Sequence, residues 1–284
     1  MSDWSTWIGR ETRAEDRLGE ALAARWLATF DRAGSVDGAM PQGIHWCLCT
    51  PDAATAALGE DGHPRRDDDA ASFFPPIPLP RRMWAASEVE FLVPLGVGAA
   101  IARSSRIERV EEKSGASGPL AFVTVRHETS AEGALAVRET QTLVYRDAAA
   151  ADASLSPPEP AQASFKPGEW QAHRALAPSP VLLFRYSALT FNSHRIHYDL
   201  PYAREVERYR GLVVHGPLMA SLLLQLAGEW LGDNTLARFA FRGLSPAIAG
   251  EPLHLVMRDE GATIVLGVFA ADGRQVVRAE AGRA

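Results

Sequence analysis

Apolar residues near the start of the chain recur at every fourth position, a spacing that places side chains on one face of a helix. The residues with this spacing are Leu18, Leu22, Trp26 and Phe30. Asp16 stands before them, where a polar side chain can cap a helix, and Gly34 stands after them, where glycine commonly ends one. The pattern predicts an amphipathic helix between Asp16 and Gly34.

Stretches typical of β-strands follow, and the same order of elements recurs in the second half of the chain. The strand-like stretches of the first half are residues 85–92, 99–111, 120–129 and 137–146. In the second half, a helical region over 187–210 and a very apolar stretch over 217–231 precede strand-like stretches over 236–244, 252–258, 263–270 and 275–279. The repeated order indicates two copies of one unit, each with antiparallel strands.

The stretch over 217–231 is apolar on nearly every helical face. Its apolar rows contain Leu218, Leu222, Leu226 and Trp230, and then Met219, Leu223 and Ala227. A helix of this kind must be enclosed by other elements rather than laid on a surface. One long enclosed helix followed by four antiparallel strands predicts an α+β fold in which a sheet wraps around the helix.

Two irregular stretches interrupt this order. Residues 147–163 are rich in alanine, serine and proline and show no apolar period, which is typical of a linker. We therefore predict an N-terminal domain over 1–147, a linker over 148–168 and a C-terminal domain over 169–284. Residues 59–80 contain many prolines, which predict a loop rather than a strand. They also contain an acidic run, 67–69, which we expect to be exposed to solvent.

The composition is that of an ordinary globular protein, with 46% apolar residues among 284. The chain carries 29 basic and 35 acidic residues, and the resulting net charge of −6 argues against partners such as nucleic acid or an acidic membrane surface. All basic residues except Lys113 and Lys166 are arginine, which suits a small phosphorylated ligand. With neither a signal peptide nor a long apolar span in view, we expect a cytoplasmic protein.

Three of the eight histidines, His194, His197 and His215, lie within the short window from residue 186 to 216. Asn192 precedes His197 by five residues, near the end of a helix or in the loop after it, where one turn can direct both side chains into a cleft. The unperturbed pKa of histidine, about 6.5, lets it take and return a proton near neutral pH.

The tripeptide His215-Gly216-Pro217 indicates the beginning of a helix. Proline is favoured at the first position of a helix, and a glycine before it lets a ligand approach free backbone N–H groups. A buried helix N-terminus here would offer both hydrogen bonds and a positive dipole to an enolate oxygen.

Four stretches, over 58–66, 74–84, 187–199 and 213–218, resemble the MaoC-like hydratases and dehydratases. The resemblance covers nearly the whole chain and is to the long double hot-dog form, close to hydratases of mesaconyl-C4-CoA, itaconyl-CoA or 3-methylfumaryl-CoA. It implies two fused hot-dog units, each an antiparallel sheet wrapped around a central helix. The implied activity is a hydro-lyase that adds water to, or removes it from, a short branched enoyl-CoA.

The resemblance also implies roles for individual residues. His197 falls on the catalytic histidine of the family motif, and Asn192 replaces the motif aspartate, so it is expected to hold water or substrate through its amide. Gly216 would donate its N–H to the thioester oxygen, and Asp199 could orient the imidazole of His197. The first unit has no counterpart of His197, so it should only shape the tunnel for the acyl group, with one active site per chain.

Further expectations concern ligands. The substrate of a diacid hydratase carries a free carboxylate, for which Arg185 and Arg195 are candidates, and His215 could touch the substrate or merely brace its loop. His194, His197 and Asp199 could form a metal-ligand set, but the family needs no metal, and no cofactor is expected beyond the CoA of the substrate. Formation of a homodimer is left open.

Three other functions compete with this prediction. The first is a 3-hydroxyacyl-thioester dehydratase of fatty-acid or polyketide metabolism. The second is an acyl-CoA-binding protein without catalysis, which the replacement at Asn192 makes credible. A hot-dog thioesterase ranks lower, because such enzymes commonly use a carboxylate at this position.

Overall fold

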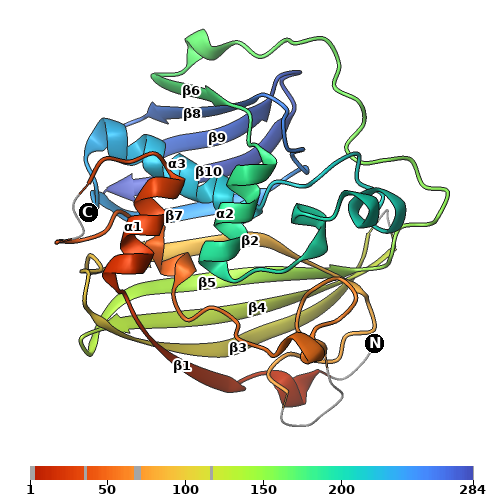
Figure 1. The fold of residues 1–284 in the computed structure, drawn as a ribbon, viewed down its shortest axis with the longest axis horizontal. Coiled ribbons are helices and arrows are strands. Elements are labelled where there is room, and N and C mark those ends of the chain that lie inside the picture. The colour runs from red at the N-terminus through yellow and green to blue at the C-terminus, as the bar shows by residue number, and fades with distance from the viewer. Residues whose placement is uncertain (1–3, 35–36, 67–71, 116–117, 284) are drawn as a thin grey trace.

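The alternating stretches of the sequence form the strands of one antiparallel sheet. The computed structural model describes residues 4–34, 37–66, 72–115 and 118–283, and the ten strands of this part follow the order β1-β3-β4-β5-β2-β7-β10-β9-β8-β6 (Figure 1). Their bounds are β1 Glu11–Arg17, β2 Arg81–Phe91, β3 Ala100–Gly115, β4 Gly118–Ala131, β5 Ala134–Arg146, β6 Ala172–Leu176, β7 Leu236–Gly243, β8 Leu253–Asp259, β9 Ile264–Ala270 and β10 Gln275–Arg283.

The sheet consists of two halves with the same strand order. Each half begins at an outer edge with its first strand, continues through its third, fourth and fifth strands, and ends at the centre with its second strand. The two halves meet where β2 pairs with β7, from Ala86 opposite Arg242 to Glu90 opposite Arg238. This shared order agrees with the predicted duplication, while the exact domain boundaries stay a prediction.

Three helices lie against the sheet. Helix α1 spans Glu20–Thr29, α2 spans Pro180–Thr190 and α3 spans Gly216–Leu231. Helices α1 and α2 pack against each other, and α3 lies against β6, β8, β9 and β10 (Figure 1). Every residue of α3 from Leu218 to Ala227 is buried, as its apolarity on all faces predicts.

The first unit differs from the expectation that each unit encloses a central helix of its own. Between α1 and β2, the described residues form only two short 3₁₀ turns, Ile44–Cys47 and Thr55–Ala57. A side chain at Gly43 would lie 3.4 Å from Leu224 of α3, so the first turn is seated directly on the helix of the second unit. One long helix therefore serves both units, because the proline-rich segment before β2 has no apolar stretch from which to build another.

Local differences from the sequence predictions have local causes. The helix expected over 187–210 ends at Thr190, because Phe191 adopts a left-handed conformation (φ 48°), and only a 3₁₀ turn and one π turn follow. Gly19, not Asp16, precedes α1 as its N-cap residue, and the Asp16 carboxylate instead accepts a hydrogen bond from the Cys49 amide (2.7 Å). Strand β1 was not predicted, because all of its residues are exposed and its sequence does not alternate between apolar and polar residues.

The two irregular stretches remain without helix or strand in their described parts, apart from a 3₁₀ turn that begins at Pro167. The connection between β5 and β6 runs along the outside of the molecule (Figure 1) and is held by paired backbone hydrogen bonds, in which Ser156 bonds to Arg208 (2.8 Å) and Arg210 to Ser156 (2.9 Å). The acidic run over 67–69 lies outside the described residues. Among those that are described, no helix is long and apolar enough to cross a membrane.

Candidate active site

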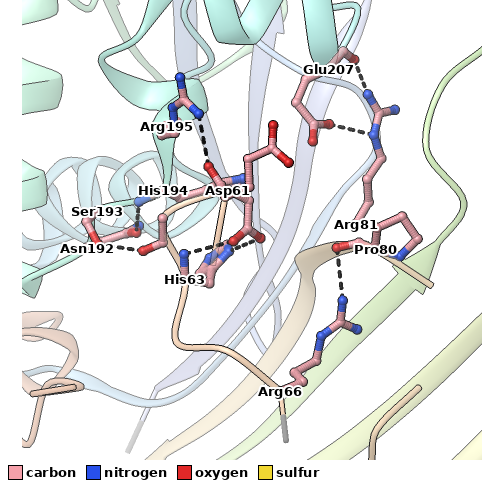
Figure 2. Close-up of polar contacts among 12 residues, drawn as sticks. Asp61, His63, Arg66, Pro80, Arg81, Asn192, Ser193, His194, Arg195 and Glu207 are labelled. Carbon is pink, nitrogen blue, oxygen red and sulfur yellow. Dashed lines mark hydrogen bonds and ion pairs between the residues drawn. The ribbon is translucent and has the colours of Figure 1, made fainter. Parts of the chain in front are cut away.

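A loop of the first unit, residues 59–63, is fastened to residues 193–195 of the second unit. The Arg195 amide donates to the Asp61 carbonyl (2.9 Å), and the Ser193 hydroxyl donates to the Gly62 carbonyl (2.6 Å) (Figure 2). Gly62 has a φ of +86°, and a Cβ atom there would lie 2.0 Å from the Ser193 carbonyl oxygen. Only glycine permits this approach, which brings side chains of both units into one site.

Four imidazole rings form a continuous row at this junction. The ring centroids of His63 and His194 are 4.2 Å apart, those of His194 and His197 are 5.5 Å apart, and those of His197 and His215 are 3.5 Å apart in a stacked arrangement. His197 and His215 were expected at the site from the sequence, and His194 only as a member of a possible metal-ligand set. His63 joins them from the first unit, 131 residues before His194 in the chain.

The imidazole of His197 is held in a defined tautomer. Its Nδ1 lies 2.7 Å from the Val213 carbonyl oxygen. Because a carbonyl can only accept, Nδ1 carries the proton and Nε2 keeps a free lone pair. Burial lowers the pKa of His197 to about 4, so the ring is neutral at pH 7 and its Nε2 can accept a proton.

The N-terminus of α3 lies next to this base. His215 is the residue before α3, its ring stacks on His197, and its Nε2 lies 2.9 Å from the Ser187 hydroxyl. Gly216, the first residue of the helix, is half-buried, and its N–H belongs to the first turn, whose donors have no acceptor within the helix. The structure thus brings His197, His215 and Gly216 together, as the sequence predicts.

Glycine at position 216 is not required by the backbone. Its φ is not in the left-handed region, and the nearest atom to a Cβ placed there is the Trp84 carbonyl oxygen at 3.9 Å. A methyl group would therefore fit the protein itself.

Asn192 has a different contact from the one expected. Its Oδ1 accepts a hydrogen bond from the His194 amide (3.0 Å), which shapes the turn that carries the histidines. In this position the amide of Asn192 stabilises the local backbone. Its expected role toward water or substrate stays a prediction.

Asp199 and Arg195 were expected to contact His197 and the substrate, respectively, but they are paired with each other. Asp199 Oδ2 lies 2.7 Å from Arg195 Nη2, and its Oδ1 accepts from the Tyr202 amide (3.1 Å). The expectation that Asp199 orients His197 is therefore wrong, since the Val213 carbonyl has that contact. The Arg195 guanidinium also donates to the Glu60 carbonyl (3.1 Å), so it fastens the loop of the first unit.

Arg185 lies outside the row of imidazoles. Its side chain is exposed and donates to the Ala28 carbonyl at the end of α1 (3.2 Å). The neighbouring residues Tyr186 and Ser187 instead face His215. The expectation that Arg185 binds substrate does not agree with this position, because adjacent helical residues point in different directions.

The pair Asp61–His63 is the part of the site to which the sequence assigned no role. Asp61 Oδ2 lies 2.9 Å from His63 Nδ1 (Figure 2). Burial alone would raise the pKa of Asp61, but the hydrogen bonds from His63 outweigh it and leave the pKa lowered. Burial and the positive charge of Arg82 lower the pKa of His63. The motif over 58–66 contains both residues, so the resemblance carried the only signal that could have found them.

Asp61, His63 and His194 also bring three atoms that could bind a metal within 4.8 Å of one another. Two of these atoms, on Asp61 and His63, are already hydrogen-bonded to each other. The charge of Arg82 also acts on all three residues and opposes the binding of a cation. The arrangement suits a hydrogen-bonded network better than a metal centre.

Comparison with known proteins places the chain in a family. The family model described as hydroxyacyl-thioester dehydratase type 2 matches residues 43–249. A mesaconyl-C(4)-CoA hydratase of Chloroflexus aurantiacus is 40% identical over 281 residues, which make up 98% of this chain and 97% of that protein. The chain belongs to the hydroxyacyl-thioester dehydratase type 2 family. A Schizosaccharomyces pombe mitochondrial protein named after this dehydratase is 33% identical over 129 residues, covering 45% of this chain and 41% of that protein.

Solved structures of low sequence identity confirm the fold of this family member. A MaoC-like dehydratase from Phytophthora capsici superposes with a TM-score of 0.73 at 13% identity, over 100% of this chain and 98% of that one. A Mycobacterium tuberculosis protein described as having a double hot-dog fold gives a TM-score of 0.62 at 14% identity, over 97% and 96% of the two chains. The predicted α+β double hot-dog fold and the resemblance to MaoC-like proteins are both confirmed.

Substitution of Gly62 tests whether the loop of the first unit is needed. We expect Gly62→Ala to lower kcat/KM by at least about tenfold, because the new methyl group must push the loop away from Ser193 and displace His63. Gly261→Ala is the matched control: its φ is +87°, but a Cβ atom there meets nothing within 4 Å. Equal losses of activity in both variants would mean that left-handed strain, and not the clash with Ser193, is responsible.

Acid should destabilise the protein through the buried imidazoles. Burial lowers the pKa of all four, and that of His197 to about 4, whereas unfolded histidine titrates near 6.5. The unfolded chain thus binds more protons below pH 6.5, so the free energy of unfolding has its full value above that pH and decreases as the pH falls toward 4. We expect urea titrations from pH 7.5 to 4.5 to show this decrease.

The contribution of His197 to this pH dependence can be separated from the rest. In the variant His197→Gln, the decrease should be smaller by about 2–3 kcal/mol at pH 4.5, since one pKa unit corresponds to about 1.4 kcal/mol. An unchanged slope in this variant would show that burial does not hold His197 neutral.

Proposed function

We propose that this protein is a hydratase that adds water across the double bond of a short branched enoyl-CoA, mesaconyl-C4-CoA, to form citramalyl-CoA. The observation that carries the proposal is the position of the His197 imidazole, with its Nε2 unprotonated and its ring stacked on the residue before Gly216. The 40% identity to the Chloroflexus mesaconyl-C(4)-CoA hydratase over nearly the whole chain supports the choice of substrate.

In the proposed reaction, His197 Nε2 takes a proton from water while the oxygen of that water bonds to the β-carbon of the thioester. The electrons of the double bond move toward the thioester carbonyl, whose oxygen becomes an enolate. The imidazolium of His197 then returns the proton to the α-carbon, which restores the neutral base. A histidine with a pKa below neutrality is available as a base throughout the physiological range.

The N-terminus of α3 would stabilise the enolate. The Gly216 N–H can donate a hydrogen bond to the thioester oxygen, and the positive end of the helix dipole favours the same negative charge. Since α3 is enclosed along most of its length, few water molecules compete for this donor. The stacked His215 stays neutral because burial and the neighbouring His197 both lower its pKa.

The same groups would catalyse dehydration in the reverse direction, so a 3-hydroxyacyl-thioester dehydratase is the second candidate. The family model and the Schizosaccharomyces pombe relative favour it. Turnover of mesaconyl-C4-CoA against a linear 2-enoyl-CoA of medium chain length separates the two. The expectations of a cytoplasmic location and of no further cofactor stay predictions, and formation of a homodimer stays open.

Replacement of His197 tests the proposed base. We expect His197→Gln to reduce kcat for mesaconyl-C4-CoA by about 10²–10⁴-fold, the usual effect of removing a general base. Hydration removes the conjugated thioester, so the loss of its absorbance measures the rate. His173→Gln is the control, because His173 is exposed and lies on β6. A folded His197→Gln variant with normal turnover would contradict the mechanism.

Replacement of Gly216 tests whether the space beside it belongs to the substrate. We expect Gly216→Ala to unfold at the temperature of the wild type, because the methyl group meets no atom nearer than 3.9 Å, but to lose about 10²–10³-fold in kcat/KM as the thioester oxygen is displaced from the N–H. Gly96→Ala is the control, since Gly96 is equally half-buried and a Cβ atom there meets nothing within 4 Å. Normal kcat/KM in Gly216→Ala would contradict the role of this N–H.

A further inference from the structure

The proposed substrate carries a free carboxylate on the same carbon that water attacks, so a cation should lie near the row of imidazoles. The arginines around this row are mostly engaged with other groups. Arg195 pairs with Asp199, and Arg81 pairs with Glu207 (2.5 Å between Nε and Oε2) (Figure 2). A third, Arg66, donates to the carbonyl groups of three loop residues, Ile77 (3.0 Å), Leu79 (2.8 Å) and Pro80 (3.1 Å).

Arg82 differs from these three arginines. Within the part of the chain that the structure describes, no carboxylate or carbonyl oxygen accepts a hydrogen bond from its half-buried guanidinium, which lies 5.6 Å from the ring centre of Phe74. Arg82 follows Arg81 on β2, so its side chain points to the other face of the strand. On β5 it stands opposite Tyr145, whose ring lies 5.2 Å from the guanidinium of Arg66.

This face of β2 lies beside the row of imidazoles. Arg66 and His63 belong to the same short loop, and the charge of Arg82 is near enough to lower the pKa of Asp61, His63 and His194. A cation that no carboxylate of the described residues neutralises, and whose neighbours are the Phe74 ring and the Tyr145 hydroxyl, therefore faces the end of the row that the first unit contributes.

The geometry of β2 also relates Arg82 to Gly216. Strand β7 pairs with β2 only over Ala86–Glu90, so the beginning of β2 has one free edge at the junction of the two units. At this edge the Trp84 carbonyl oxygen lies 3.9 Å from the Cβ position of Gly216. Arg82 and Trp84 are two residues apart on the strand, which corresponds to about 6.6 Å. The Arg82 side chain therefore starts from the same short stretch of β2 that touches the first residue of α3.

We propose that Arg82 binds the free carboxylate of the substrate and thereby selects a branched C5 diacid thioester over a simple enoyl thioester. The inference rests on the proposed function. A guanidinium can form two parallel hydrogen bonds with a carboxylate, which would fix the β-carbon beside His197 while the thioester oxygen lies at Gly216. The first unit would then supply substrate specificity, and the second unit would supply the base and the donor for the enolate.

A matched pair of substrates tests this proposal. In 3-methylcrotonyl-CoA, a methyl group replaces the carboxylate of mesaconyl-C4-CoA and nothing else changes. We expect Arg82→Gln to lower kcat/KM for mesaconyl-C4-CoA by about 10²-fold, because the carboxylate loses its charged partner. The same variant should change kcat/KM for 3-methylcrotonyl-CoA by less than about threefold. If the wild type turns over the latter too slowly to measure, its inhibition constant against mesaconyl-C4-CoA replaces kcat/KM.

Arg185→Gln is the control variant, because Arg185 is exposed and contacts the end of α1; it should behave as the wild type with both thioesters. Equal losses with both thioesters in Arg82→Gln, or no loss with either, would overturn the proposal. If Arg82→Gln does not fold, Arg82→Lys is the second variant, because it keeps the charge but lacks the planar guanidinium. Its selectivity for the diacid thioester should fall by at least about fivefold. Unchanged selectivity would overturn the proposal. Failure of the wild type to hydrate mesaconyl-C4-CoA would instead overturn the proposed function.

Discussion

The enclosure of one apolar helix is the constraint on which the rest of this structure depends. Helix α3 has no polar face, so water must be kept from all sides of it. The sheet of the second unit covers it through β6, β8, β9 and β10, and the 3₁₀ turn of the first unit that begins next to Gly43 covers another side. The largest apolar cluster of the described residues contains side chains of both units, because neither unit alone surrounds this helix. Contact between the two units is therefore needed to keep water from α3.

The same enclosure explains where the proposed active site lies. A buried helix still has first-turn N–H groups without acceptors, and here they open at the junction of the two units, beside His197 and His215. Burial also keeps the histidines neutral, since a charged imidazole would lose its hydration. The proposed site thus combines a neutral imidazole that can accept a proton with an N–H group that can donate to a negative oxygen. Both properties arise from the exclusion of water, and the stability of the fold in acid is reduced for the same reason.

The two units have diverged toward different contributions. The second unit keeps the long helix and the histidine motif. The first unit has no such helix in its described residues, and the segment between α1 and β2 has become a loop that reaches across the junction, held by contacts of Asp61 and Gly62 with Ser193 and Arg195. The first unit is thus more than the passive wall expected from its lack of a catalytic histidine. It contributes His63 to the row of imidazoles and Asp61 as the hydrogen-bond partner of His63. Its strand β2 forms one side of the junction.

Sequence alone determined the features that depend on local pattern. The apolarity of 217–231 predicted α3 almost to the residue, and alternation predicted eight of the ten strands, because burial of one face leaves a period in the chain. The motif around His197 and the glycine before Pro217 identified the two groups that meet at the site. Tertiary structure decided the partners of individual side chains: the Val213 carbonyl rather than Asp199 holds His197, and Arg195 pairs with Asp199. Such partners depend on how distant segments pack. Ser193 contacts Gly62, which lies 131 residues earlier in the chain, and the local pattern of apolar and polar residues carries no information about that contact.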